Sequence, residues 1–499
     1  MSEYCFPPRF LWGISMSAFQ YEMGASKESV DPNSDWYVWL HDPFNVVNGR
    51  VSGDVPENGP GYWDLFRTDH DWAKWIGLNA WRINPDWSRI FPRSTEEVKV
   101  DVHRDEGIID IDITERDLEK LDKLANADAV KHYEEIFRDI KEKGMKLIVN
   151  LYHWPLPLWI HDPIVARDSF LREGALGWYE ERSVVEFAKY VAYVAWKFGG
   201  LADMWSTMNE PNVVWMLGYN NLIFPPGVIC PEASLRVAIN MIEAHARAYD
   251  QIKRFTGSDY VGIIYAVTPS EPLTDSEEDR RASEISDYRS TLWYFEAIIN
   301  GILDTSFGDM FEGEKITRKD LKDKADWIGV NYYSRSVVTS FKEPYFYRVV
   351  PNYGFACSPR SKSSDNRPTS DFGWELYPEG IRKAINLVKV YGKPLMITEN
   401  GVADSRDYIR PWQIPTHLAQ VYKAIREDGA NVMGYLHWSL IDNLEWAAGF
   451  RQRFGLIYVD METKRRYPRP SAFIYREIVR NNCIPEYLEE YARFPNILV

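Results

Sequence analysis

Eight short apolar runs, spread along the whole chain, constrain the fold more than any other feature of this sequence. Most are nearly continuous in apolar character, which is typical of strands in a parallel sheet with both faces buried. They lie at residues 10–18, 79–87, 146–153, 204–209, 261–267, 327–333, 394–399 and 432–439. We therefore expect eight buried strands.

Amphipathic helices are predicted between these runs. Apolar residues three and four positions apart, followed by glycine, indicate three of them. The three stripes are Val130, Tyr133, Phe137 and Ile140 before Gly144; Val184, Phe187, Ala188, Val191, Ala195 and Phe198 before Gly199; and Leu418, Val421, Tyr422 and Ile425 before Gly429. Strands that alternate with helices predict an α/β fold, a (β/α)8 TIM barrel. No flexible linker divides the 499 residues, so we expect one domain over residues 1–499.

Three segments fit no barrel element and predict long insertions in the loops that follow strands. They are residues 92–128, 269–289 and 335–375. The first is strongly charged, with charged residues side by side at 105–106, 115–117 and 119–120. We expect it to be a solvated excursion at the edge of a cleft or at an oligomer contact.

Composition and charge exclude several classes of function. The net charge of −15 argues against a nucleic-acid surface, which would need a basic stripe. No apolar run approaches the roughly 20 residues of a membrane span, and no secretory leader is visible. The four cysteines, Cys5, Cys230, Cys357 and Cys483, show no metal or framework spacing. We expect mostly reduced thiols in a cytoplasmic protein.

Two glutamates follow strand-like runs and precede turn-forming residues. Glu210 lies in Thr207-Met208-Asn209-Glu210-Pro211-Asn212, and Glu399 lies in Ile397-Thr398-Glu399-Asn400-Gly401. A carboxylate that enters a loop at the end of a barrel strand is well placed for catalysis. Cleavage of a glycosidic bond needs such a pair, one to protonate the leaving oxygen and one to attack or stabilise the anomeric carbon.

Other predicted strand ends also carry polar or aromatic side chains. These are Gln20, Arg82, His153, Trp154, Asn209, Asn331, Tyr332, Tyr333 and Trp438, with Glu445 and Trp446 just beyond the last strand. Taken singly, His153 fits a core histidine, Arg82 fits a structural ion pair and each aromatic ring fits the core. The two glutamates could be capping or salt-bridge groups. Burying an unpaired carboxylate is unfavourable, so the pair favours function, and tryptophan faces suit the apolar faces of sugars.

Other chemistries find little support in the sequence. There is no phosphate-binding or dinucleotide-binding glycine loop, no HExxH metal spacing and no Gly-x-Ser-x-Gly nucleophile elbow. An aldolase would need a lysine at a strand end, and none of the predicted ends has one. A non-catalytic sugar-binding protein is a weaker alternative because both glutamates are present, and transglycosylation would use the same residues.

The chain resembles the β-glycosidases of glycoside hydrolase family one, and within them the archaeal, heat-adapted branch. The resemblance runs from end to end of the chain. The motifs are Phe10-Leu11-Trp12-Gly13, Asp31-Pro32-Asn33-Ser34-Asp35-Trp36, Trp87-Ser88-Arg89-Ile90-Phe91-Pro92, the two glutamate motifs, Phe454-Gly455-Leu456 and Arg469-Pro470-Ser471-Ala472. It implies a retaining, exo-acting β-glucosidase or β-galactosidase that needs no cofactor and acts on small-molecule or oligosaccharide β-glycosides.

The resemblance also implies roles for individual residues. Glu210 is expected to be the acid/base and Glu399 the nucleophile, with their carboxyl groups about 5–5.5 Å apart. Arg82, Asn331 and Tyr333 are expected to support them. The sugar is expected to contact Gln20, His153, Trp154, Asn209, Trp438, Glu445 and Trp446.

Two further expectations come with the family. Its members often form tetramers, so we expect a homo-oligomer, and the apolar tail at residues 484–499 could join a contact. The sequence departs from the common pattern at Asn84, where many members have serine, and around Ser15-Met16-Ser17 in strand one. These departures bear on the shape of the pocket and leave the carboxylates unchanged.

Overall fold

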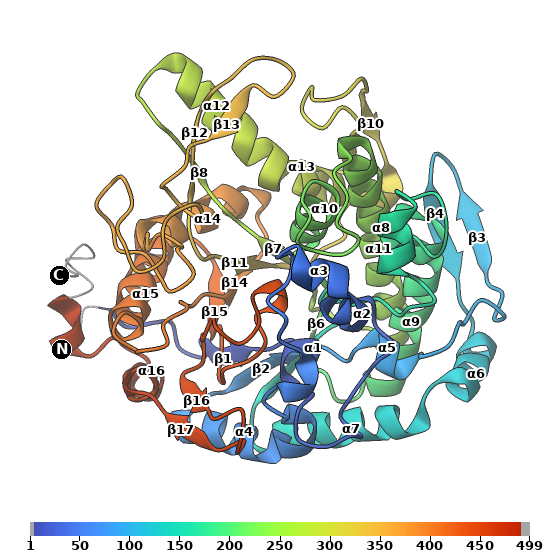
Figure 1. The fold of residues 1–499 in the computed structure, drawn as a ribbon, viewed down its shortest axis with the longest axis horizontal. Helices are drawn as coiled ribbons and strands as arrows, with labels where there is room; N and C mark the ends of the chain where they lie inside the picture. The colour runs from blue at the N-terminus through green and yellow to red at the C-terminus, as the bar shows by residue number, and fades with distance from the viewer. Residues whose placement is uncertain (1–3, 491–499) are drawn as a thin grey trace.

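A closed barrel of eight parallel strands forms the centre of the molecule (Figure 1). The computed structural model describes residues 4–490. The barrel strands are β1 Leu11–Ser15, β2 Ala80–Ile83, β5 Lys146–Asn150, β6 Met204–Asn209, β7 Val261–Ala266, β11 Trp327–Asn331, β14 Leu395–Glu399 and β15 Val432–His437. Their order around the barrel is β1-β15-β14-β11-β7-β6-β5-β2, closed by pairing of β1 with β2. All eight predicted strands and the predicted TIM barrel are confirmed.

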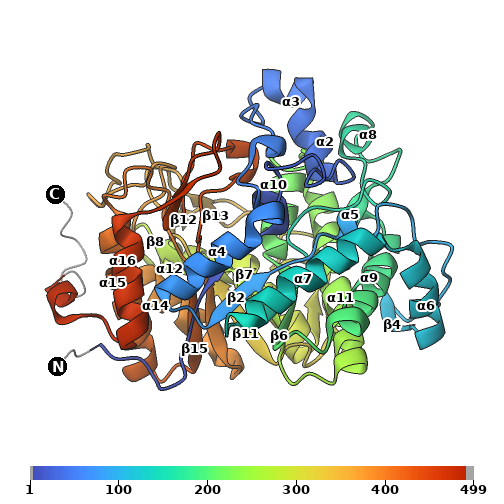
Figure 2. The same cartoon turned by 90° about the horizontal axis from the view of Figure 1, so that it is seen from below.

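Helical segments that follow the barrel strands lie outside this barrel (Figures 1 and 2). They are α4 Tyr62–Ile76, α7 Ala127–Glu142, α9 Arg182–Phe198, α11 Pro231–Thr256, the segment from α12 Glu277–Asp287 through η4 Glu296–Asn300, α14 Glu379–Val388, α15 Arg410–Arg426 and α16 Pro470–Asn481. The predicted stripes of α7 and α9 are buried, while Tyr422 and Ile425 of α15 are half-buried. The Asn126 side chain caps the first turn of α7, and α7 ends just before Gly144.

The inside of the barrel is filled by side chains rather than open. One buried residue from each of seven strands meets there, and Leu11 of β1 packs against them. The seven are Ala80, Ile148, Met204, Ile264, Trp327, Met396 and Leu436. Because successive strand residues point to opposite faces, Arg82 lies on the same inward face of β2 as Ala80, two residues nearer its carboxyl end. The packed layer thus lies below the polar residues of the strand ends.

The three insertions lie in loops that follow β2, β7 and β11, as predicted. The first holds the hairpin β3 Asp101–Arg104 with β4 Ile108–Asp112, then α6 Glu115–Leu124. The other two contribute β8 Ser270–Pro272, β12 Ser336–Ser340 and β13 Tyr347–Val349 to one three-stranded sheet. The expectation of a solvated excursion at 92–128 was wrong for part of this segment. Ile108, Ile111, Leu118 and Leu121 are fully buried, because these apolar residues pack under a charged outer face.

Short helices make up further parts of the loops after the strands. The ones used below are α1 Ala18–Tyr21, α2 Asp35–His41, α3 Pro43–Val47, α5 Trp87–Ile90, α8 Pro163–Asp168 and α10 Pro211–Tyr219. Helices α2, α3 and α8 lie together at one end of the molecule (Figure 2).

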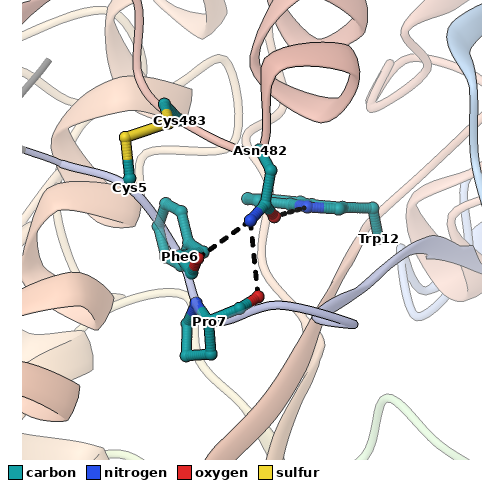
Figure 3. Close-up of a disulfide and its surroundings, with 6 residues drawn as sticks. All are labelled: Cys5, Phe6, Pro7, Trp12, Asn482 and Cys483. Carbon is teal, nitrogen blue, oxygen red and sulfur yellow. Dashed lines mark hydrogen bonds between the residues drawn. A yellow bond between two sulfur atoms is a disulfide. The ribbon is translucent and has the colours of Figure 1, made fainter. Parts of the chain in front are cut away.

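A disulfide joins the two ends of the described chain (Figure 3). It links Cys5 to Cys483, and backbone hydrogen bonds from Phe6 N to Asn482 O and from Ile484 N to Tyr4 O flank it, each at 3.0 Å. The prediction of mostly reduced thiols was therefore wrong for this pair. Its residues are 478 positions apart, and only the fold brings them together. Cys230 and Cys357 are free thiols, as expected. Residues 491–499 of the predicted apolar tail lie outside the described part of the chain.

Candidate active site

The two glutamates enter the site at the carboxyl ends of two barrel strands, β6 and β14, which are separated by β7 and β11. Glu399 is the last residue of β14, and Glu210 follows β6 directly and precedes Pro211, the first residue of α10. The backbone of Glu210 is left-handed, with φ 47° and ψ 57°, a conformation that non-glycine residues rarely adopt. Such strain persists where the surrounding structure enforces it, and it is concentrated at functional positions.

Both oxygens of the Glu399 carboxyl accept hydrogen bonds. Arg82 Nη1 donates to Oε1 at 2.6 Å, and the Tyr333 hydroxyl donates to Oε2 at 2.8 Å. Arg82 is fully buried, and Glu399 is only 4% exposed. A short ion pair to a buried guanidinium favours the ionised carboxylate, which is the form that a nucleophile needs.

Glu210 is tied to the same group of side chains through two amides. Asn331 Nδ2 donates to Glu210 Oε1 at 2.8 Å and to Asn209 Oδ1 at 3.0 Å. Arg82 Nη2 donates to the same Asn209 oxygen at 2.6 Å. The two carboxyl groups are therefore linked by one continuous network from Glu399 through Arg82, Asn209 and Asn331 to Glu210. The structure brings together residues that are 189 positions apart in the sequence (399 − 210).

Strand register explains why Asn331 can reach both glutamates. In the barrel, Asn331 of β11 lies opposite Glu399 of β14 on one side and Ala266 of β7 on the other. Tyr332, the next residue, points away from the site, and its hydroxyl donates to the Tyr377 carbonyl. Alternation along the strand thus separates Asn331 and Tyr333 from Tyr332, which the sequence had grouped with them.

Burial and like charge separate the proton affinities of the pair. Burial, followed by the negative charge of Glu399, raises the pKa of Glu210 to about 8. Burial also raises the pKa of Glu399, but Arg82 and the hydrogen bond from Tyr333 oppose this rise. At neutral pH the arrangement therefore favours one proton on Glu210 and an ionised Glu399.

Gln20 and Glu445 form a second polar part of the site. Gln20 Nε2 donates to the Leu444 carbonyl at 2.8 Å and to Asn443 Oδ1 at 3.2 Å. Burial, and then the charge of Glu399, raises the pKa of Glu445 to about 8. Within residues 4–490, Gln20 Oε1 and Glu445 Oε2 are buried acceptors without a hydrogen-bond partner. Buried polar atoms usually have partners, so the two oxygens are suited to hydroxyl groups of a ligand.

Aromatic rings line the space around these polar groups. The Trp446 ring centroid lies 4.6 Å from that of Trp154 and 6.0 Å from that of His153, and Trp438 stacks on His153 at 6.1 Å. Trp154 Nε1 donates to the Asn209 carbonyl at 3.2 Å. Flat apolar faces beside unsatisfied polar oxygens match the two kinds of surface on a sugar ring.

His153 connects the aromatic side of the site to the carboxylate network. Its Nε2 lies 3.1 Å from Asn209 Nδ2 and its Nδ1 lies 3.3 Å from Arg82 Nη2. Burial, and then the charge of Arg82, holds the pKa of His153 well below its ordinary value. The ring is therefore neutral at pH 7 and can serve as a hydrogen-bond partner for an uncharged ligand.

All twelve predicted site residues are linked by direct contacts or by charge effects within this one region. Sequence reasoning missed three residues that hold them in place. Thr398 Oγ1 donates to Asn331 Oδ1 at 2.6 Å, Arg82 Nη1 donates to Ser15 Oγ at 3.3 Å, and Asn443 fixes Gln20. Ser15 and Thr398 are polar residues near strand ends and Asn443 lies in the loop after β15, but the partners of all three come from other segments of the chain.

The described part of the chain offers neither a metal-binding cluster nor a membrane-spanning helix. Residues 4–490 contain no cluster of three or more histidine, cysteine, aspartate or glutamate side chains that could hold a metal ion. No helix within that range is both long enough and apolar enough to span a membrane.

Comparison with known proteins gives consistent matches over the whole chain. The model of the family described as Glycosyl hydrolase family 1 matches residues 2–102 and 122–484, and the gap between them falls in the β3–β4 hairpin and α6. The chain is 48% identical over 498 residues to a β-galactosidase of Saccharolobus solfataricus, and the match covers 99% of each chain.

Solved structures agree with these matches. The β-glycosidase of the hyperthermophile Thermosphaera aggregans superimposes with a TM-score of 0.92 at 48% identity, covering 98% of this chain and 99% of that chain. A β-glucosidase mutant derived from a hyperthermophilic tetrameric structure gives a TM-score of 0.89 at 46% identity and covers 98% of both chains.

Proposed function

The chain belongs to glycosyl hydrolase family 1, and from this premise we propose that Glu210 and Glu399 are its acid/base and its nucleophile. The protein is a retaining β-glycosidase of the β-glucosidase and β-galactosidase type, which removes terminal β-linked sugars by double displacement. The observation that supports the assignment is the shared network in which Arg82 binds Glu399 while Asn331 binds Glu210.

In the first half-reaction, Glu399 Oε2 or Oε1 attacks the anomeric carbon as the bond to the leaving oxygen breaks. Glu210 gives its proton to that oxygen, so the leaving group departs as an alcohol. The pKa of about 8 keeps Glu210 protonated at neutral pH. Arg82 and Tyr333 hold the nucleophile in one orientation by contacting both of its oxygens.

In the second half-reaction, the sugar is esterified to Glu399, and the negative charge of that carboxylate is gone. The charge that had raised the pKa of Glu210 is then absent, so Glu210 can act as a base and take a proton from water. The hydroxide equivalent attacks the anomeric carbon and releases Glu399. Two displacements leave the sugar with its original β configuration.

Sugar recognition is assigned to Gln20, His153, Trp154, Asn209, Trp438, Glu445 and Trp446. The unpartnered oxygens of Gln20 and Glu445 support this assignment because they can accept from sugar hydroxyls. When ionised, Glu445 would repel a 6-phosphate group, and when protonated, below its pKa of about 8, it offers no positive charge to bind one. We therefore propose neutral glucosides and galactosides as substrates. A higher kcat/KM on a 6-phospho-β-glycoside than on its neutral parent would overturn this choice.

One experiment tests the proposed reaction directly. Hydrolysis of aryl β-glucosides and β-galactosides is followed by NMR, and the anomer released first is recorded. Retention predicts that the β-anomer appears before mutarotation mixes the two forms. The α-anomer as first product, or no turnover on any aryl β-glycoside, would contradict the proposal.

The state of the molecule in the cell is also a proposal. All 499 residues are assigned to one catalytic domain, assembled as a homo-oligomer with a tetramer as the expected form, as named for one relative. Light scattering on purified protein would test it, and a monomer would contradict it.

We propose a cytoplasmic location without nucleic-acid or membrane partners. The disulfide is compatible with this location because intracellular proteins of hyperthermophiles are often rich in disulfides.

A further inference from the structure

The single-turn helix α1 supports the sugar-binding side of the site through three successive residues. The Phe19 ring stacks on Trp446 with an interplanar angle of 3°, Gln20 binds the Leu444 carbonyl, and the Tyr21 ring meets Trp438 edge-on. All four residues of α1 are buried. A small shift of this helix would therefore move Gln20 and disturb its contacts to Trp438 and Trp446, and the proposed function assigns all three residues to the sugar.

The N-terminus of α1 is capped by a residue from the loop that follows β2. Ser17 occupies the N-cap position, but its side chain makes no capping hydrogen bond, and its Oγ has no partner within residues 4–490. Instead, Asn84 Oδ1, just after β2, accepts from the Ala18 backbone N–H at 2.8 Å. A cap supplied from the loop after β2 fixes the helix relative to the barrel wall rather than only to its own chain.

The residue that follows the C-terminal end of α1 is linked by hydrogen bonds to the same residue, Asn84. Glu22 follows α1, and its Oε2 pairs with Arg89 Nε at 2.6 Å and accepts from the Tyr133 hydroxyl at 3.2 Å. That hydroxyl accepts from Asp86 N at 3.0 Å, and Asp86 Oδ1 accepts from Asn84 Nδ2, also at 3.0 Å. A closed ring of contacts thus runs from Ala18 through Asn84, Asp86, Tyr133 and Glu22 back along α1.

Asn84 contributes both a donor and an acceptor to this ring. Its oxygen accepts from α1 and its amide nitrogen donates to Asp86, and it is 1% exposed. A serine hydroxyl is shorter and cannot span both partners. Three carboxyl groups, of Glu22, Asp31 and Asp86, lie close to Arg89, and burial raises the pKa of Glu22 to about 7. An added negative charge at position 84 would therefore face strong repulsion.

We infer that Asn84 is a positioning residue for the sugar, which acts through α1 on Gln20 and on the 438–446 segment. The inference rests on the proposed function, because it takes Gln20 as a sugar-binding residue. Asn84 itself is linked to the reaction only through the backbone of α1.

The test compares Asn84→Ser with Asn240→Ser. Asn240 lies on the outer helix α11 and donates one hydrogen bond to the Trp178 carbonyl at 2.8 Å, so it serves as a control for the loss of a side-chain contact. We measure kcat and KM on an aryl β-glucoside and the inhibition constant of glucose. Asn84→Ser should raise KM and the inhibition constant about tenfold, the effect of one well-placed hydrogen bond. Asn240→Ser should change neither.

A second variant covers the case in which Asn84→Ser does not fold. Asn84→Asp keeps the acceptor for Ala18 N–H but can donate to Asp86 only while the new carboxyl is protonated. The groups that face it are Glu22, Asp31, Asp86, Arg89, Tyr133 and Tyr190. Its KM should approach the parent value near pH 5 and rise by about pH 7, as a carboxyl in an acidic cluster ionises. Because Glu22 in the parent ring has a pKa of about 7, the readout is the change of KM in Asn84→Asp beyond the parent profile over this interval.

Gln20→Ala separates failure of this inference from failure of the proposed function. If Gln20→Ala leaves glucose inhibition unchanged, the role of Gln20 in the proposed function is wrong. The inference alone is overturned by a different pair of results. In that case Gln20→Ala weakens glucose inhibition, whereas both Asn84 variants keep the parent KM and inhibition constants and lose only thermal stability. In the Gln20→Ala background, Asn84→Ser should change the inhibition constant of glucose by a factor of about three or less. The reason is that Asn84 is proposed to act on the sugar through Gln20, so the effects of the two substitutions are not additive.

Discussion

The carboxyl of Glu210 has little solvent around it and a negative charge beside it, and both conditions favour its neutral form. Glu399 has the same burial but is held by Arg82 and Tyr333. We propose different roles for these two glutamates of identical intrinsic acidity because their neighbours differ. Substitutions at these two positions should therefore have different kinetic signatures.

Glu399→Gln should reduce turnover by at least about a thousandfold on every substrate, because an amide cannot form the glycosyl ester. Glu210→Ala should lose about a hundred- to ten-thousandfold on alkyl glycosides, which need a proton on the leaving oxygen. On a dinitrophenyl β-glucoside, Glu210→Ala should show a burst of dinitrophenol followed by a slow steady state. Full activity of Glu210→Ala on alkyl glycosides would show that the roles are assigned wrongly.

The pH dependence of kcat/KM should have an alkaline limb near pH 8. Glu210 must carry a proton in the free enzyme, so activity is present below its pKa and is lost as pH rises through about 8. Because Glu445 also has a pKa of about 8, the assignment needs a control. The limb should persist in Glu445→Gln and should vanish in Glu210→Gln assayed on a dinitrophenyl glucoside. The reverse pattern would assign the limb to Glu445.

At the scale of elements, the first insertion shows how an exposed hairpin can contribute to the core. Ile108 of β4 is fully buried, its N–H donates to Glu243 Oε2 at 3.0 Å, and its carbonyl accepts from Arg247 Nη1 at 2.8 Å. Both partners belong to the outer helix α11. The hairpin therefore supports the outer helix α11. None of the proposed site residues belongs to this hairpin.

Ile108→Ala should lower the free energy of unfolding by about 2–4 kcal/mol through loss of buried apolar contact and a residual cavity. The measurement is chemical unfolding, together with kcat and KM below the unfolding transition. The kinetic constants should stay within about twofold of the parent, as for a change remote from the site. His103→Ala, at an exposed position on the paired strand β3, is the control and should change neither property. A large kinetic effect of Ile108→Ala would mean that this insertion shapes the site.

At the scale of the whole molecule, the Cys5–Cys483 disulfide closes the chain on itself. The N-terminal segment before β1 and the segment after α16 are held side by side, and Asn482 Oδ1 also accepts from Trp12 Nε1 at 2.8 Å (Figure 3). Cross-linking residues far apart in sequence restricts the unfolded chain, which stabilises the folded state.

Cys5→Ser, Cys483→Ser and the double variant should each lose about 2–5 kcal/mol of stability and should resemble one another, because each removes the same bond. Thermal unfolding with and without reductant measures this. Cys230→Ser and Cys357→Ser are the matched controls, since both residues are free thiols. Titration of unfolded protein without reductant should find two thiols. Four thiols, or unchanged stability of the double variant, would contradict the prediction.

The eight strands, the three helices and the positions of Glu210 and Glu399 were all predictable from the sequence. Strand and helix patterns are local: buried strands need runs of apolar residues, and helices need apolar residues every three or four positions. The glutamates could be found because each directly follows such a run. The β3–β4 hairpin was misjudged because its charged residues conceal the buried Ile108 and Ile111.

Only the tertiary structure decided which residues become neighbours, and the chemistry depends on those neighbours. The proton on Glu210 depends on burial and on a charge 189 positions away (399 − 210). The link of Cys5 to Cys483 and the cap that Asn84 gives to α1 join segments that have no shared local pattern. Hydrophobic periodicity is a property of one segment, whereas electrostatic and hydrogen-bond energies depend on distances between segments, which exist only in the folded chain.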